Sequence, residues 1–112
     1  MKIKDFDTYQ KECKKTAKYP TIGEKFVYPT IGLVGEAGEV SEKVKKLFRD
    51  HGGKMTKEYK MEIAKGLGDV MWYVAQLSTE LKLKLSDIAT MNIEKLSSRK
   101  VRGKISGSGD NR

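Results

Sequence analysis

The sequence predicts an all-α protein, and two features of the 112-residue chain indicate this. Apolar residues recur at the three- and four-residue spacing of a helix in four segments, which proline or glycine residues separate. No segment shows the alternation of apolar and polar residues that is typical of a half-buried strand. We therefore expect a single domain over residues 1–112, built as a bundle of four to five helices.

Each helix has its own signals. The first ends before Pro20, which disfavours helical geometry in the residue ahead of it, and the second accepts Pro29 in its first turn. The third is expected to begin after Thr56 as its N-cap, and the fourth after a cap at Ser86 or Asp87. A tail rich in glycine and serine, flexible by composition, follows from about residue 103. The expected helices cover residues 6–17, 26–48, 57–81 and a segment that begins near residue 86.

The third helix carries apolar residues on a face wide enough to contact two neighbours. Because a chain of this length forms only a modest core, we expect subunits to associate, at least as a dimer. Several glycines in the second and third helices are expected to let these helices approach closely. They are Gly32, Gly35, Gly38, Gly66 and Gly68.

Composition and charge narrow the class of protein. With 38% hydrophobic and 34% charged residues, the chain is typical of a soluble globular domain. Cys13 is the single cysteine, which suits a reducing cytoplasm, and no apolar run approaches the length of a membrane span. The net charge of +8 is concentrated at the two ends of the chain. A basic excess around a near-neutral middle favours a polyphosphate substrate over a nucleic-acid duplex.

Three acidic residues in that middle predict a metal site. Glu36 and Glu39 lie one turn apart on the same face of the second helix, and Asp69 lies at the polar edge of the third. Carboxylates that converge repel one another unless a cation binds them. Oxygen ligands without a histidine or cysteine cluster indicate Mg²⁺, for which Mn²⁺ can substitute, and phosphate is a natural ligand of such an ion.

Other residues are candidates for contacts with a substrate. Asn92, Lys95 and Arg99 recur at helical spacing in the fourth helix, where the pattern alone favours an ordinary solvated face over a phosphate clamp. Trp72 follows Asp69 closely and is either a packing residue or a base-stacking one. Lys54, in a glycine-containing loop, is a further candidate for phosphate contact.

The chain resembles the MazG-like, all-α nucleoside triphosphate pyrophosphohydrolases, including phage-type members. The resemblance runs through the Tyr9-Gln10 pair, residues 32–40, 67–73, 92–96 with Arg99, and 107–112. It implies a helical bundle assembled as a dimer or a dimer of dimers. It also implies Mg²⁺-dependent hydrolysis of a (d)NTP, for example a purine such as dGTP or dATP, to the monophosphate and pyrophosphate, in the cytoplasm of a bacterium or a phage-infected host.

The resemblance also assigns roles to residues. Family members bind Mg²⁺ with the four acids of an ExxE…ExxD signature, in which Glu36 and Glu39 match the first pair and Asp69 the last acid. Glu39 would orient or deprotonate the attacking water. Lys95 and Arg99 would neutralise charge on the leaving pyrophosphate, and Asn92 would donate a hydrogen bond to it.

Residue 66 departs from the signature, because Gly66 stands where the remaining acid is expected. In one interpretation the three acids suffice, since Mg²⁺ normally keeps several waters. In another, Glu62 replaces the missing ligand. In a third, catalysis is lost and the chain is a nucleotide-binding or regulatory bundle, or residue 66 was changed deliberately. A basic, nucleic-acid-binding helical protein remains an alternative of another class.

Overall fold

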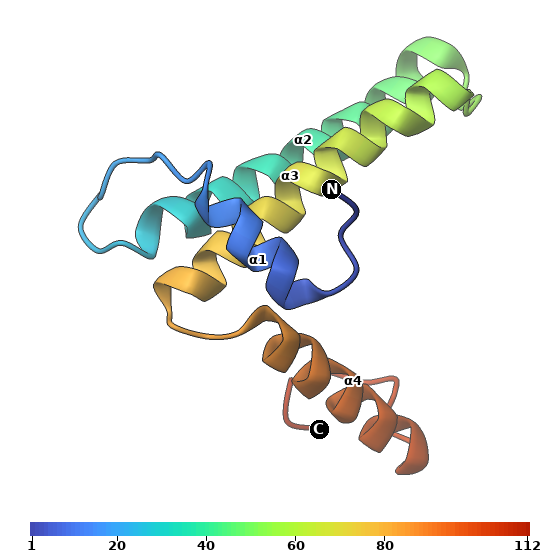
Figure 1. Ribbon diagram of the computed structural model, residues 1–112. Helices are drawn as coiled ribbons and strands as arrows, with labels where there is room; N and C mark the ends of the chain where they lie inside the picture. The colour runs from blue at the N-terminus through green and yellow to red at the C-terminus, as the bar shows by residue number, and fades with distance from the viewer.

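The computed structural model describes residues 1–112 and confirms an all-α protein, with four helices and no strand (Figure 1). An isolated bridge between Ile22 and Glu24 is the only β-type pairing. None of the helices has the length and apolar character needed to cross a membrane. The helices are α1 (Phe6–Lys14), α2 (Val27–His51), α3 (Lys57–Glu80) and α4 (Leu85–Val101).

Helix α1 is shorter than the expected 6–17. Asp5 caps its N-terminus by accepting the backbone N–H of Thr8 at 2.7 Å. The helix ends at Lys14, and the hydroxyl of Thr16 donates to the carbonyl of Cys13 at 3.2 Å. This side-chain bond satisfies a carbonyl that a longer helix would have used, so the last predicted turn is replaced by a bend.

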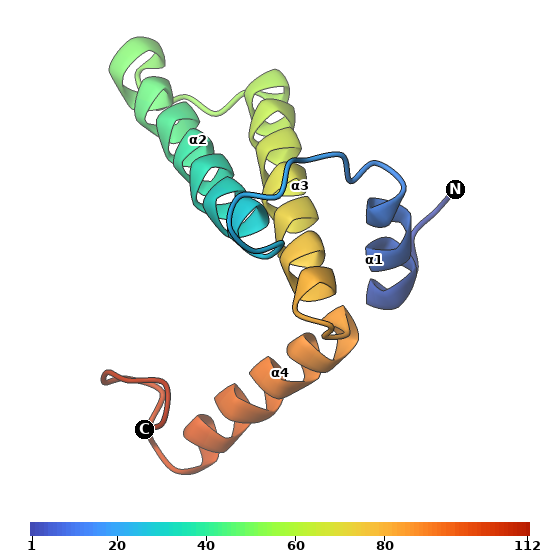
Figure 2. The same ribbon diagram turned by 90° about the vertical axis from the view of Figure 1, so that its left-hand side faces the viewer.

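Helices α2 and α3 form a long antiparallel hairpin, which Figure 2 shows side on. Helix α2 runs to His51, past the predicted end at residue 48, and stops where Gly52 takes a left-handed conformation with φ of 62°. Thr56 caps α3 as predicted, because its Oγ1 accepts the N–H of Tyr59 at 3.0 Å. The hairpin is the most extensive helix pair of the fold and carries the predicted acids.

Only two of the five glycines expected to bring these helices together do so. An added Cβ at Gly32 would overlap the ring of Tyr73, and one at Gly66 would lie 2.9 Å from Cγ2 of Val40. At the other three positions, Gly35, Gly38 and Gly68, a Cβ would meet nothing within 4 Å. The prediction was therefore wrong for these three, which lie on open faces of the hairpin.

Helix α4 turns away from the hairpin and packs on α1 and α3, but not on α2 (Figures 1 and 2). Its predicted cap at Ser86 or Asp87 was wrong, since the N-cap is Lys84, whose side chain makes no capping bond. Helix α1 supplies the acceptor instead. The buried side chain of Gln10 accepts the N–H of Leu85 through Oε1 at 2.8 Å, and its Nε2 donates to the carbonyl of Leu83 at 2.9 Å.

The interior of the subunit is small, because only 10 of its 112 residues are buried. The core contains Cys13, Ala75 and Leu85, against which Tyr9 and Trp72 pack. Many large apolar side chains stay exposed, including Ile31, Val34 and Phe48 on α2 and Met91, Ile93 and Val101 on α4. The four helices therefore do not enclose a common core within one subunit.

The C-terminal tail folds back beside α4 (Figure 2). Arg99, which is 4% exposed, donates from Nη2 to the carbonyls of Gly109 and Asp110. Arg112 donates from Nη1 to the carbonyl of Gly109 at 2.7 Å and from Nη2 to that of Ile105 at 2.8 Å. Arginine side chains thus close residues 103–112 into a loop.

Candidate functional site

The acids of α2 lie one turn apart near the middle of the hairpin. Oε2 of Glu36 is shielded from solvent and has no hydrogen-bond partner, although the residue as a whole is only half-buried. Loss of solvent raises the pKa of Glu36, and a hydrogen bond with Glu39 and the negative charges of Glu39 and Asp69 raise it further. Glu36 is therefore a carboxyl group that holds a proton more readily than an exposed glutamate does.

Asp69 is an exposed residue of α3 whose charge acts on Glu36, and two tyrosines lie near these acids. The ring of Tyr73 lies directly against the backbone of Gly32, one turn before Glu36. Burial raises the pKa of Tyr73, and the nearby charges of Glu36 and Asp69 add to this effect. The hydroxyl of Tyr9 donates to the carbonyl of Gly68 at 3.5 Å, beside Asp69.

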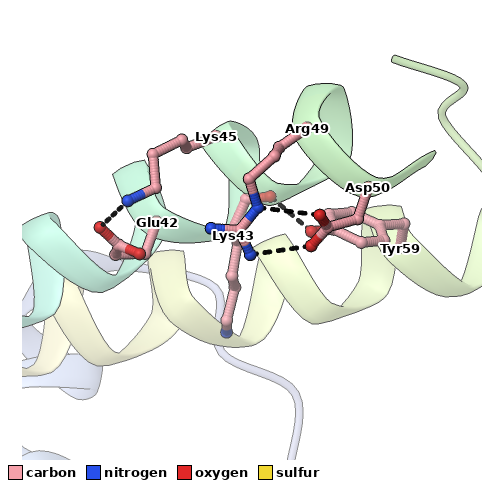
Figure 3. A network of polar contacts seen from close by, with 6 residues as sticks. All are labelled: Glu42, Lys43, Lys45, Arg49, Asp50 and Tyr59. Atoms are coloured by element: carbon pink, nitrogen blue, oxygen red, sulfur yellow. Dashed lines mark hydrogen bonds and ion pairs between the residues drawn. The ribbon is translucent and has the colours of Figure 1, made fainter. Parts of the chain in front are cut away.

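A lysine is the cationic neighbour of the acids. Lys43 lies one turn after Glu39, and its side chain extends across α3 (Figure 3). Its Nζ donates to the backbone carbonyl of Glu62 at 2.9 Å. Its positive charge opposes the rise in the pKa of Glu36. The same figure shows the ion pair of Lys45 with Glu42 at 2.7 Å, on the outer side of α2.

The acids fit a hard divalent cation, as the resemblance implied. No three acidic, histidine or cysteine side chains are already arranged as a metal-binding group. The pair of Glu36 and Glu39 is nevertheless suitable, because Mg²⁺ usually takes one or two carboxylates together with waters and phosphate oxygens. The unpartnered oxygen of Glu36 is an acceptor that a cation would satisfy, and a proton held by Glu36 would then be released.

Glu62 and Lys54 lie away from this pair. The carboxylate of Glu62 forms an ion pair with Lys65 at 2.9 Å, and only its backbone carbonyl contacts Lys43. Lys54 lines a pocket of about 310 Å³ with His51, Thr56 and Tyr59 at the turn of the hairpin. From Glu36 to that end of α2 the helix rises by about 22 Å, so Lys54 and the acids serve different places in one subunit.

The residues of α4 that were predicted to contact the substrate lie away from the acids of α2. Arg99 binds backbone carbonyls of the tail, as described above, and Nζ of Lys95 lies 3.5 Å from the carboxylate of Asp110. Asn92 is exposed. Because α4 does not pack on α2, the three residues do not meet Glu36 and Glu39 within one subunit.

Trp72 is used for packing in this structure. Its Nε1 donates to Oγ1 of Thr16 at 3.0 Å, which ties α3 to the end of α1. Its ring meets Tyr19 and Tyr73 edge to face, with centroids 6.2 Å and 5.0 Å apart.

A comparison with protein families agrees with this arrangement. Residues 30–102 match the MazG nucleotide pyrophosphohydrolase domain, a segment that includes the acid pair, Asp69 and all of α4. The chain belongs to the MazG family. The resemblance inferred from sequence motifs is thereby confirmed.

A relative of this MazG domain is a phage protein. The Gene 37 protein of Mycobacterium phage L5 is 51% identical over 111 residues, which cover 95% of this chain and 97% of that protein. This similarity agrees with the expected phage-type member. No solved structure matches the chain significantly.

The sequence motifs did not single out two neighbours of the acids in the MazG domain. Lys43 has the spacing that would have placed it beside Glu39, but lysines are frequent in this helix and none stood out. Tyr73 falls within residues 67–73 of the resemblance, which did not mark it as a neighbour of the acids. Its contact with Gly32 depends on how α2 and α3 align, which helical periodicity does not reveal.

Proposed function

We propose that this MazG domain hydrolyses a (d)NTP, for example a purine such as dGTP or dATP, to the nucleoside monophosphate and pyrophosphate. Mg²⁺ is the expected cofactor, with Mn²⁺ as a substitute, and the cytoplasm of a bacterium or phage-infected host is the expected location. The observation that carries the proposal is the unpartnered, shielded oxygen of Glu36, on which the charges of Glu39 and Asp69 act. Family membership supports the reaction class.

Residues of the hairpin would have different roles in this reaction. Glu36, Glu39 and Asp69 would hold the cation, which when bound polarises the triphosphate for attack. Glu39 is exposed and lies one turn after Glu36, so it is placed to orient a water molecule and accept its proton. The water oxygen forms a bond to the α-phosphorus, and the bond to the bridging oxygen of pyrophosphate breaks.

The leaving pyrophosphate needs positive charge, which we propose comes from a second subunit. Lys95 and Arg99, with Asn92 as a hydrogen-bond donor, are on a helix that does not reach the acids of its own subunit. Exposed apolar residues on both α2 and α4 supply a surface for association. A homodimer or homotetramer would therefore complete the site, and these α4 residues would act after the tail releases them.

The test is incubation with each (d)NTP and Mg²⁺, with products separated by anion-exchange chromatography. Monophosphate and pyrophosphate are expected, and their formation should stop in Glu36→Gln. Release of orthophosphate and a diphosphate would contradict the assigned bond. Glu42→Gln, which removes an acid on the outer side of α2, is the matched control and should keep its activity.

A catalytically weakened nucleotide-binding bundle is the second candidate, because Gly66 supplies no ligand. A Gly66→Glu variant tests this, but its new side chain would collide with Val40. We therefore pair it with Val40→Ala to make room. A large gain in turnover in the double variant, relative to Val40→Ala alone, would show that the natural chain is impaired, and no gain would show that three acids suffice.

The nucleic-acid alternative predicts a different result. Binding of duplex DNA that weakens steeply with salt and persists in Glu36→Ala would support it. Strict dependence of nucleotide turnover on a divalent cation, without DNA binding, would leave the hydrolase as the function.

A further inference from the structure

Lys43 takes an unusual path for a helix-surface lysine. Most lysines of α2 extend into solvent or form ion pairs along their own helix, as Lys45 does with Glu42. The side chain of Lys43 instead extends across α3 (Figure 3). Its Nζ donates to the carbonyl of Glu62 at 2.9 Å, and the residue is half-buried. A hydrogen bond from a cation to a backbone carbonyl is stronger than one between neutral groups, so the ammonium is held in place.

Gly66 provides the space for this ammonium. It is buried, and an added Cβ would lie 3.4 Å from Nζ of Lys43 and 2.9 Å from Cγ2 of Val40. A residue with a longer side chain at position 66 would compete with Lys43 for the same volume. The glycine and the lysine are therefore complementary features of two neighbouring helices.

The position of Lys43 matters for the charge of the acid cluster, by which we mean Glu36, Glu39 and Asp69. When ionised, these carboxylates carry three negative charges. Lys43 contributes one positive charge, and its Nζ lies 3.4 Å from the Cβ position of residue 66, one turn before Asp69. The balance is two negative charges, which one divalent cation neutralises. Glu62 adds little to this balance because its carboxylate is paired with Lys65.

We propose that Lys43 is a positioning residue that serves as an internal cation of the acid cluster, so that each subunit binds a single divalent ion there. The proposal rests on the proposed function, because it assumes that the cluster binds a metal. It also gives Gly66 a structural role. The position lacks the carboxylate of the family signature, and its small size leaves room for the ammonium of Lys43.

Binding of Mn²⁺ to the full-length protein, without nucleotide, tests this by isothermal titration calorimetry and by the electron paramagnetic resonance signal of free Mn²⁺. The natural protein should bind one ion per chain. Lys43→Met keeps a long apolar side chain but removes the charge, so its affinity for that ion should rise about threefold to thirtyfold because a repelling charge is gone.

Two variants make the result specific. Lys45→Met changes the net charge equally but removes a lysine that is paired on the outer side of α2, and its Mn²⁺ affinity should stay within about twofold of the natural protein because exposed charges are screened. Lys43→Arg keeps the charge and should also stay close to the natural protein. Circular dichroism at the titration temperature confirms that each variant is folded, with Lys43→Gln as a replacement if Lys43→Met is not.

The outcomes separate this inference from the proposed function. Two ions of similar affinity per chain in the natural protein, or equal affinities in Lys43→Met and Lys45→Met, would overturn the role of Lys43 and leave the hydrolase intact. Absence of any Mn²⁺ binding to the natural protein would overturn both.

Discussion

Val40 packs against the bare backbone of Gly66, and its Cγ2 lies 2.9 Å from the position that a Cβ of residue 66 would take. A contact this short means that any side chain at residue 66 pushes α2 and α3 apart or displaces Val40. The closeness of the two helices thus depends on this glycine, whereas Gly68, two residues further on, has open space around it.

Substitution by alanine should change the free energy of unfolding in opposite directions at Gly66 and Gly68. We expect Gly66→Ala to lower the free energy of unfolding by about 1–3 kcal/mol, as overpacking does. Gly68→Ala should raise it by about 0.5–1 kcal/mol, because alanine favours the helix and meets no neighbour. Urea denaturation of both variants measures the difference. Destabilisation of similar size in both would show that packing against Val40 is unimportant.

The raised pKa of Glu36 predicts how the stability of the metal-free protein changes with pH. Its ordinary value is 4.5, and the folded state keeps the proton to higher pH than the unfolded state does. The stabilisation from this proton is complete below about pH 4.5 and is lost as the pH rises through the folded value. Melting temperatures of the natural protein and Glu36→Gln should therefore agree near pH 4, and the variant should melt higher at pH 7.

Glu42→Gln is the control for that experiment. A hydrogen bond and ion pair with Lys45 lower the pKa of Glu42, so its contribution to stability is present at neutral pH and is lost on acidification. The control should not melt higher than the natural protein at pH 7. Added Mn²⁺ should stabilise the natural protein and Glu42→Gln, but not Glu36→Gln.

Gln10 should be more important for stability than its position on a short helix suggests. It accepts the first N–H of α4 and donates to the carbonyl of Leu83, so Gln10→Leu leaves the buried N–H of Leu85 and the carbonyl of Leu83 without these partners. We expect a loss of about 1–3 kcal/mol in the free energy of unfolding. Asp7→Asn, which alters a longer bond of 3.4 Å to Ser86, should cost much less. Equal losses in urea denaturation would contradict the capping role.

Arg99 should control whether the C-terminal loop is closed. Arg99→Met removes the donor to the carbonyls of Gly109 and Asp110, and amide hydrogen exchange over residues 103–112 should accelerate at least tenfold. Asp110→Asn removes only the exposed ion pair with Lys95, at 3.5 Å, and should have little effect. Unchanged exchange in Arg99→Met would show that the loop is held by other contacts.

Helical periodicity predicted the four helices because each carries a local pattern and a local stop signal. The differences arise where a partner from another part of the chain decides. Thr56 caps α3 with its own side chain and was predicted, whereas the N-terminus of α4 uses Gln10 from α1 and was not. A helix capped by a distant residue carries no local cap in its sequence.

The same reasoning applies to the candidate site. Glu36 and Glu39 were placed together by spacing within one helix, and Asp69 was expected to converge with them from the polar edge of the third helix. Tyr73 and Lys43 depend on the alignment of α2 with α3, which Gly32 and Gly66 set. Sequence spacing could not show that only two of the five glycines lie at the contact between α2 and α3. The other three have open space around them.

The sparse interior described above makes the folded state sensitive to mass action. In the proposed homo-oligomer, a chain with 10 buried residues would gain much of its apolar burial by covering the side chains that α2 and α4 leave in water. Dilution would then remove stability from each chain, and a change that weakens the contact between chains would act like a change in the core. Such an assembly would persist only above a threshold concentration of the chain.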